Sequence, residues 1–178
     1  MIGEIRDPET ARIATEASLT GHLVFSTLHT NNAPSAITRL LDIGVKPFLV
    51  ASSVRGVMAQ RLIRNICVNC KEEYTPTDVE LRTLGPFADQ LTSMKLYRGR
   101  GCNNCNLTGY HGRTGVFEIF VVTDEIQRMI FSKTSAAELR VRARQLGMRT
   151  LREDGLRKIV AGVTTLEEVM RVTMGDID

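Results

Sequence analysis

The residues with the clearest chemistry are four cysteines arranged as two CxxC pairs. They are Cys67, Cys70, Cys102 and Cys105, and the sequence has no others. Two such pairs can offer four thiolates to one tetrahedral ion, so their spacing indicates a closed zinc site with a structural role. The 31 residues from Lys71 to Gly101 exceed the usual gap between such pairs. Free thiols, a disulfide pair or an iron–sulfur cluster remain alternatives.

A carboxylate and a histidine stand at the ends of two expected strands. Glu4 follows the apolar Met1–Ile2, and His29 and Thr30 follow the apolar run His22–Leu28. Ligands of parallel sheets bind at the carboxyl ends of the strands, so these groups could meet around one phosphate. Glu4 could polarise an attacking water or hold a metal-bound water, and His29 could donate to a phosphate oxygen. Capping of the next helix is the structural alternative for Glu4.

His22 is the second histidine of the same run. Seven residues at about 3.3 Å each would place it roughly 23 Å from His29 in a straight strand. Both histidines should therefore not contact the same phosphate. We expect His29 to be the histidine of the site, whereas His22 could equally pack or cap at the start of the strand.

The first helix is marked at both ends. Asp7 precedes Pro8, which is a strong helix start with Asp7 as N-cap, and Gly21 fits the C-terminal stop. His22–Leu28 is an almost unbroken apolar run, as expected for a strand covered on both faces. Strand, helix and strand within residues 1–28 form a βαβ unit, which predicts parallel strands.

Further elements are expected downstream. A second helix should run from about Pro34 to Ile43, and Pro47 opens a third that should end near Leu62. A short helical patch follows Pro76-Thr77-Asp78. Residues 115–122 read as a strand, and three or four short helices follow it.

These elements divide the sequence into three parts. Residues 1–64 are α/β in pattern, residues 65–112 form a tetracysteine metal-binding module, and residues 113–178 form a strand plus a helical C-terminal subdomain. Two helices of the last part open with capping boxes, Ser135–Glu138 and Thr165–Glu168.

Composition limits the function classes. The net charge of +3 is mixed in sign along the chain, so nothing indicates a nucleic-acid partner. The arginines at 140–152 are best interpreted as a solvated helical face; an acidic protein or lipid partner is the alternative. No apolar run reaches the roughly 20 residues of a membrane span, and no signal peptide is seen, so we expect a soluble, intracellular chain.

Several motifs together resemble one protein family. GEIRDPETA and TGHLVFSTLHTNNA (residues 20–33) are similar to the Walker B region and histidine box of the type II secretion and type IV pilus assembly ATPases. The resemblance continues through AQRLIR (59–64), the CxxC pairs, GYHGRTGVFE (109–118) and LEEVMRVT (166–173). It thus covers almost the whole chain.

The resemblance implies a fold and a set of site residues. Residues 1–64 would be the C-terminal part of a RecA-like, P-loop NTPase core with a partial parallel sheet. Glu4 would be the Walker B glutamate that acts on Mg²⁺ and the attacking water, and His22 and His29 would be the two histidines of the box. Thr30 and Arg113 would lie at the nucleotide; a salt bridge that fixes its turn is the alternative for Arg113.

The resemblance also implies ATP, Mg²⁺ and Zn²⁺ as cofactors and a ring of six subunits. The family couples ATP hydrolysis to protein secretion or pilus assembly through platform proteins of the inner membrane, which implies a cytoplasmic, membrane-peripheral location. Its metal-binding insertion is typical of secretion and pilus-extension members, which argues against a retraction motor.

One departure from the family pattern is large. The sequence contains no GxxxxGK[ST] loop, which would supply the phosphate cradle and its lysine. The chain therefore corresponds to a C-terminal portion of such an ATPase and is expected to bind ATP poorly and not to hydrolyse it alone. Whether it is an enzyme stays open. The alternative is a free-standing, zinc-stabilised interaction module without ATPase activity.

Overall fold

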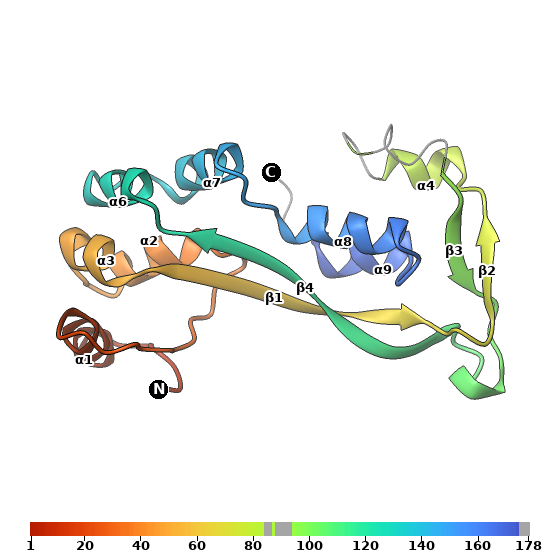
Figure 1. Cartoon of the computed structure of the whole chain (residues 1–178), viewed down its shortest axis with the longest axis horizontal. Coiled ribbons are helices and arrows are strands. Elements are labelled where there is room, and N and C mark those ends of the chain that lie inside the picture. Colours follow the sequence, from red (N-terminus) through yellow and green to blue (C-terminus); the bar gives the residue numbers. More distant parts are fainter. Residues whose placement is uncertain (84–86, 88–93, 175–178) are drawn as a thin grey trace. The chain divides into compact units, whose positions relative to one another are not determined.

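The computed structural model describes residues 1–83, 87 and 94–174 (Figure 1). The chain forms two compact units. Unit 1 contains residues 1–59 and 118–149, and unit 2 contains residues 60–117 and 150–178. These units interleave along the sequence, whereas the three expected parts follow one another, so that division stays a prediction about domains.

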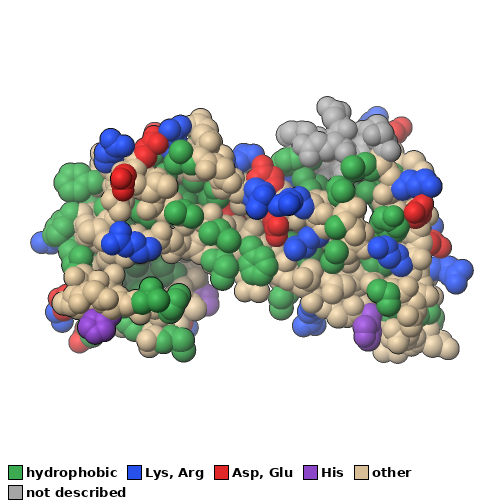
Figure 2. Space-filling view, in the orientation of Figure 1, with side chains coloured by type: hydrophobic (Ala, Val, Ile, Leu, Met, Phe, Trp, Pro, Cys, Tyr) green, Lys and Arg blue, Asp and Glu red, His purple; other side chains and the backbone are tan. Residues whose placement is uncertain are grey.

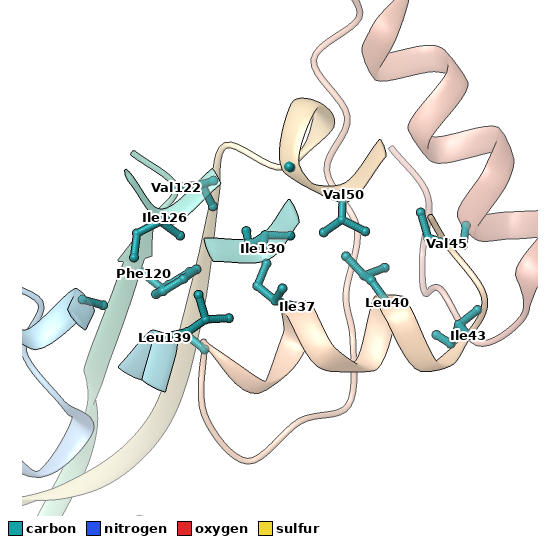
Figure 3. Packing of buried hydrophobic residues seen from close by; sticks show 14 residues of the cluster. Ile37, Leu40, Ile43, Val45, Val50, Phe120, Val122, Ile126, Ile130 and Leu139 are labelled. Atoms are coloured by element: carbon teal, nitrogen blue, oxygen red, sulfur yellow. The ribbon is translucent and has the colours of Figure 1, made fainter. Parts of the chain in front are cut away.

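Unit 1 is built from short helices around one apolar core. Its helices are α1 (Pro8–Leu19), α2 (Ser35–Asp42), α3 (Pro47–Ser53), α6 (Asp124–Phe131) and α7 (Ala136–Gln145). Figure 3 shows the core side chains, which come from the helices, from strand β4 (Tyr110–Val121) and from the segments that adjoin α2 and β4. Ile37, Phe120, Ile126, Ile130 and Leu139 are fully buried. This core holds α2 and β4 together, and both of them matter for the site below.

The expected start and stop of the first helix are confirmed. The Asp7 side chain accepts a hydrogen bond from the backbone N–H of Thr10 at 2.8 Å, and Pro8 is the first residue of α1. Gly21 follows the helix with a φ of +94°, a conformation that costs glycine little.

The expected parallel sheet is not formed among the described residues. Met1–Ile5 and His22–Leu28 form no regular strand, although hydrogen bonds join Ile2 N to Phe25 O (2.9 Å) and Ile5 N to Thr27 O (3.0 Å). Leu23 and Phe25 are 78% and 64% exposed, so the prediction of a strand covered on both faces is wrong. Parallel strands depend on such cover, and two bonds alone do not make a ladder.

The third helix is also shorter than expected. It ends at Ser53, and strand β1 (Gly56–Ile66) replaces its predicted second half. Along the first half of β1, exposed and half-buried residues alternate, which is the period of a strand and not of a helix. β1 pairs with β4 in an antiparallel two-stranded sheet, and the expected strand at 115–122 is the second half of β4 (Figure 1).

Unit 2 contains the second antiparallel pair. β2 (Lys71–Tyr74) pairs with β3 (Leu96–Gly99), with Lys71 opposite Gly99. The expected helical patch after Pro76 is confirmed as α4 (Asp78–Arg82), which opens with a capping box between Thr77 and Glu80. Among the described residues of unit 2, the other helices are the 3₁₀ turn η2 (Asn103–Cys105), α8 (Leu151–Val160) and α9 (Leu166–Val172). Its core is formed by Leu81, Leu96, Leu156, Ile159, Leu166 and Val169.

The two expected capping boxes have different outcomes. The box of Ser135 and Glu138 is confirmed at the start of α7. Thr165 caps α9 as expected, but the Glu168 carboxylate binds two arginines instead of returning to the cap. A further box, Thr150 with Glu153, opens α8 and was not expected.

Glu168 is the centre of a buried ionic cluster in unit 2. Its side chain is 0% exposed and accepts hydrogen bonds from the backbone N–H of Arg64 (2.9 Å), from the Arg64 guanidinium (2.7 Å) and from Arg171 (2.7 Å). Burial opposes the charge, but the Arg171 and Arg64 hydrogen bonds prevail and lower the pKa of Glu168 to about 2. Arg64 also stacks on Tyr110 at 4.0 Å, so the cluster ties α9 to β1 and β4.

The surface carries mixed charges. On the face drawn in Figure 2, acidic and basic side chains are interspersed. Within the described residues, no helix combines the length and the apolar composition needed to cross a membrane.

Candidate functional site

The structure brings Glu4 and His29 into direct contact. His29 Nε2 lies 2.8 Å from Glu4 Oε1, and Arg6 Nη2 lies 2.6 Å from Glu4 Oε2. The hydrogen bond from Arg6 lowers the pKa of Glu4, so this side chain is a carboxylate at neutral pH. A carboxylate with an adjacent imidazole can orient a water and move a proton. The catalytic roles of both residues stay predictions.

Arg6 was not predicted from the sequence. It is two residues after Glu4 in the chain, and alternate residues of a strand would point to the same side. That spacing was the available signal. Its guanidinium is 73% exposed and leaves Glu4 the more buried member of the pair, at 21%.

The other expected site residues have surroundings of their own. The His22 ring is at the end of α1, where Nδ1 is 3.1 Å from Thr20 Oγ1 and 3.2 Å from the carbonyl oxygen of Ala17. The sequence left open a packed or capping histidine at the start of the strand, whereas the ring here contacts the end of the preceding helix. Thr30 Oγ1 donates to the Asn32 carbonyl at 3.0 Å and so stabilises its own loop. Arg113 is exposed on β4, and the described residues provide no ion pair for it.

The loop between His29 and α2 is held at two points. Asn32 Oδ1 caps α2 by accepting from the backbone N–H of Ser35 at 3.0 Å. The backbone N–H of Ala33 donates to Oε1 of Glu118 at 2.8 Å, and Glu118 is 0% exposed in β4. No local sequence pattern predicted this contact, because its partners are 85 positions apart.

The four cysteines form one compact cluster. Their Sγ atoms all lie within 4.8 Å of one another. Three of the separations are 3.9 Å (Cys67–Cys102), 3.9 Å (Cys70–Cys105) and 3.8 Å (Cys102–Cys105). Zn–S bonds of about 2.3 Å in a tetrahedron require S···S edges of about 3.8 Å. The donor set and its spacing therefore fit a closed Zn²⁺ site.

Hydrogen bonds to sulfur favour the thiolate forms that a metal requires. Cys105 Sγ accepts from the backbone N–H groups of Cys102 (3.2 Å) and Gly109 (3.3 Å), and Cys70 Sγ accepts from Gly101 N–H (3.3 Å). Burial opposes the charge on Cys105, but these donors lower the pKa of its thiol to about 6. Burial raises the pKa of Cys70 to about 11.

Two glycines allow the cysteine loops to approach. A Cβ on Gly99 would collide with the carbonyl group of Gly109. Gly109 has a φ of +78°; its carbonyl accepts from Cys67 N–H at 2.9 Å, and its N–H donates to Cys105. Backbone contact at this point therefore sets the distance between the two CxxC pairs.

We expect Gly99→Ala to weaken zinc binding at least about tenfold, because the displaced Gly109 no longer supports Cys67 and Cys105. Competition with a zinc chelator measures the affinity. Gly3→Ala is the matched control, since its Cβ meets nothing within 4 Å. Equal affinities of the two variants would contradict the role of this contact.

Solved structures with a similar fold are ATPases. The chain matches the pilus retraction motor PilT with bound ADP at a TM-score of 0.62 and 24% identity, over 95% of this chain and 37% of PilT. It matches the ATPase DotB of Legionella pneumophila at a TM-score of 0.62 and 20% identity, over 98% of this chain and 38% of DotB. The mixed α/β fold is therefore one that such ATPases contain.

Sequence comparison gives the family. The profile described as "Type II/IV secretion system protein" matches residues 1–171, and the chain belongs to this family. It is 52% identical to the type IV pilus assembly ATPase PilB of Thermus thermophilus over 174 residues, which are 98% of this chain and 20% of that protein. It is also 52% identical to the type II secretion system protein E of Pseudomonas aeruginosa over 173 residues, 97% of this chain and 34% of that protein.

The resemblance found in the sequence motifs is thereby confirmed. The chain spans a fifth to about a third of the length of these relatives and corresponds to a C-terminal portion of them.

Proposed function

We propose that this chain is the part of a secretion or pilus-assembly ATPase that supplies the hydrolytic carboxylate and a structural zinc centre. The observation that carries the proposal is the 2.8 Å contact between Glu4 and His29, made by two motifs that resemble the Walker B region and the histidine box. Family membership supports the reaction class, since the named relatives include ATPases. The RecA-like core and the ring of six subunits belong to the same proposal.

Each residue has a defined task in this proposal. ATP with Mg²⁺ supplies the phosphoryl group, and its phosphates would be held by a loop that this sequence lacks. Glu4, kept ionised by Arg6, orients the attacking water and accepts its proton. His29 donates a hydrogen bond to the terminal phosphate, and its contact with Glu4 keeps both groups at one place. Thr30 and Arg113 would contribute contacts to the bound nucleotide.

The zinc centre has a structural task. Cys67, Cys70, Cys102 and Cys105 would hold the ion with no open coordination position, so the site would not activate water. The first cysteine loop directly follows β1, and its Cys67 N–H donates to the carbonyl of Gly109 in the second loop. The last residue of β1, Ile66, donates its N–H to the Val163 carbonyl before α9 at 2.8 Å. The ion would therefore stabilise the two cysteine loops of unit 2. Platform proteins of the inner membrane are the partners that we propose for the whole protein, on the strength of the family.

Histidine substitutions test the proposed function. In a protein that carries this chain together with a phosphate-binding loop, His29→Ala is expected to lower kcat about 10²-fold or more. His22→Ala should have a smaller effect, because its ring caps α1. His111→Ala is the control, being an exposed histidine of β4. Steady-state phosphate release gives all three rates, and equal losses for His22→Ala and His29→Ala would contradict the assignment.

A further inference from the structure

We propose that Glu118 is a positioning residue that fixes the loop after His29 and so holds the His29 ring against Glu4. The inference rests on the proposed function for the importance of His29. Its geometric content, a link from β4 to the carboxylate–histidine pair, can be tested without nucleotide.

The burial of Glu118 calls for a specific partner. Its side chain is 0% exposed in β4, and Phe120, two residues later in the same strand, is also fully buried. A carboxylate removed from water is strongly unfavourable unless it is hydrogen-bonded or paired. Its Oε1 atom accepts a hydrogen bond from the backbone N–H of Ala33, in the loop after His29, at 2.8 Å.

The contact lies at the point where the loop must be fixed. Ala33 is itself 0% exposed and is four residues from His29 in the chain. Asn32 already caps α2 through Ser35, and Thr30 binds the Asn32 carbonyl. Glu118 therefore fastens to β4 a segment whose internal hydrogen bonds keep its shape, and this shape continues back to His29.

His29 needs such support because its own side chain is little constrained. The ring is 81% exposed, and within the described part of the chain Glu4 is the polar partner found for it. An exposed ring with one hydrogen bond stays in place only if its backbone is held. Glu118 supplies that hold from a strand 85 positions away from Ala33.

The test is an NMR measurement on the whole 178-residue chain with ¹³C,¹⁵N-labelled histidine. Glu4→Gln provides the reference spectrum in which the ionic partner of His29 is lost. Glu118→Leu removes the acceptor for Ala33, Glu118→Asp withdraws it by one methylene but keeps the charge, and Glu118→Gln keeps an acceptor oxygen at the same length. Ile130→Ala, in the core of the same unit, is the control for a general loss of stability.

We expect the His29 ring resonances of Glu118→Leu and Glu118→Asp to move most of the way towards those of Glu4→Gln. Exchange of the Ala33 amide should rise at least about tenfold, because its acceptor is lost. Glu118→Gln should keep the His29 ring resonances of the unaltered chain, and so should Ile130→Ala.

The proposal is overturned if Glu118→Asp leaves the ring resonances in place, or if Ile130→Ala moves them equally. Should Glu118→Leu not fold, Asp and Gln at this position still decide between the two outcomes. A positive NMR result with unaltered ATP hydrolysis in His29→Ala would refute the proposed function alone.

Discussion

Replacement of Cys105 by serine is expected to abolish tight zinc binding and to unfold the two cysteine loops of unit 2. Cys105 is buried and accepts two backbone N–H groups, so its thiolate has the most support in the cluster. Structural zinc sites contribute about 10–16 kcal/mol of apparent binding free energy, which acts as folding free energy. Hydrogen–deuterium exchange should rise by orders of magnitude in residues 66–71 and 99–110. Unit 1 has its own core and should keep its protection.

Val68→Ser is the matched control for this prediction. Val68 lies inside the first CxxC pair but is 82% exposed and provides no metal ligand. The variant should bind zinc as tightly as the unaltered chain. If Cys105→Ser, or the unaltered chain after zinc removal, showed unchanged exchange in these residues, the loops would fold without a metal and the prediction would be wrong.

Glu168→Leu is expected to destabilise unit 2 by about 1–3 kcal/mol, because it leaves two arginines and a part-buried N–H without their acceptor. Urea unfolding measures the loss. Glu167→Gln is the control, since Glu167 is the exposed neighbour on the same helix and should change stability by less than about 0.5 kcal/mol. Similar midpoints for Glu168→Leu and the unaltered chain would contradict a stabilising role of the cluster.

The same carboxylate predicts a dependence on acid. The folded pKa of Glu168, about 2, is below its ordinary value of 4.5, so its stabilisation is complete above pH 4.5. It is lost as the pH falls through 4.5 towards 2, by up to about 3 kcal/mol for a shift of this size. In Glu168→Leu this part of the acid sensitivity should be absent.

Local patterns predicted the ends of helices and the metal cluster well. Asp7 with Pro8, Ser135 with Glu138 and the patch after Pro76 were correct, because a cap is set by residues within one turn of each other. The cysteine cluster was also predicted correctly, because two CxxC pairs in one chain are typical of a site that uses four thiolates.

The sequence failed for one helix boundary and for contacts between residues that are far apart in the chain. The helix opened by Pro47 was predicted to continue to about Leu62, but the burial of residues 56–62 alternates and they form the first part of β1. Glu118 with Ala33 and Glu168 with Arg64 were missed because these pairs are 85 and 104 positions apart. No short window of sequence contains such partners, and only the fold brings them together.

The most direct test of the account separates binding from hydrolysis at Glu4. In a protein that carries this chain and a phosphate-binding loop, ATP affinity and single-turnover hydrolysis are measured for Glu4→Gln and for the control Glu9→Gln in the exposed first turn of α1. We predict that Glu4→Gln binds ATP within about threefold of the unaltered protein but hydrolyses it at least about 10²-fold more slowly. Hydrolysis at the unaltered rate in Glu4→Gln would contradict the assignment of this carboxylate to catalysis.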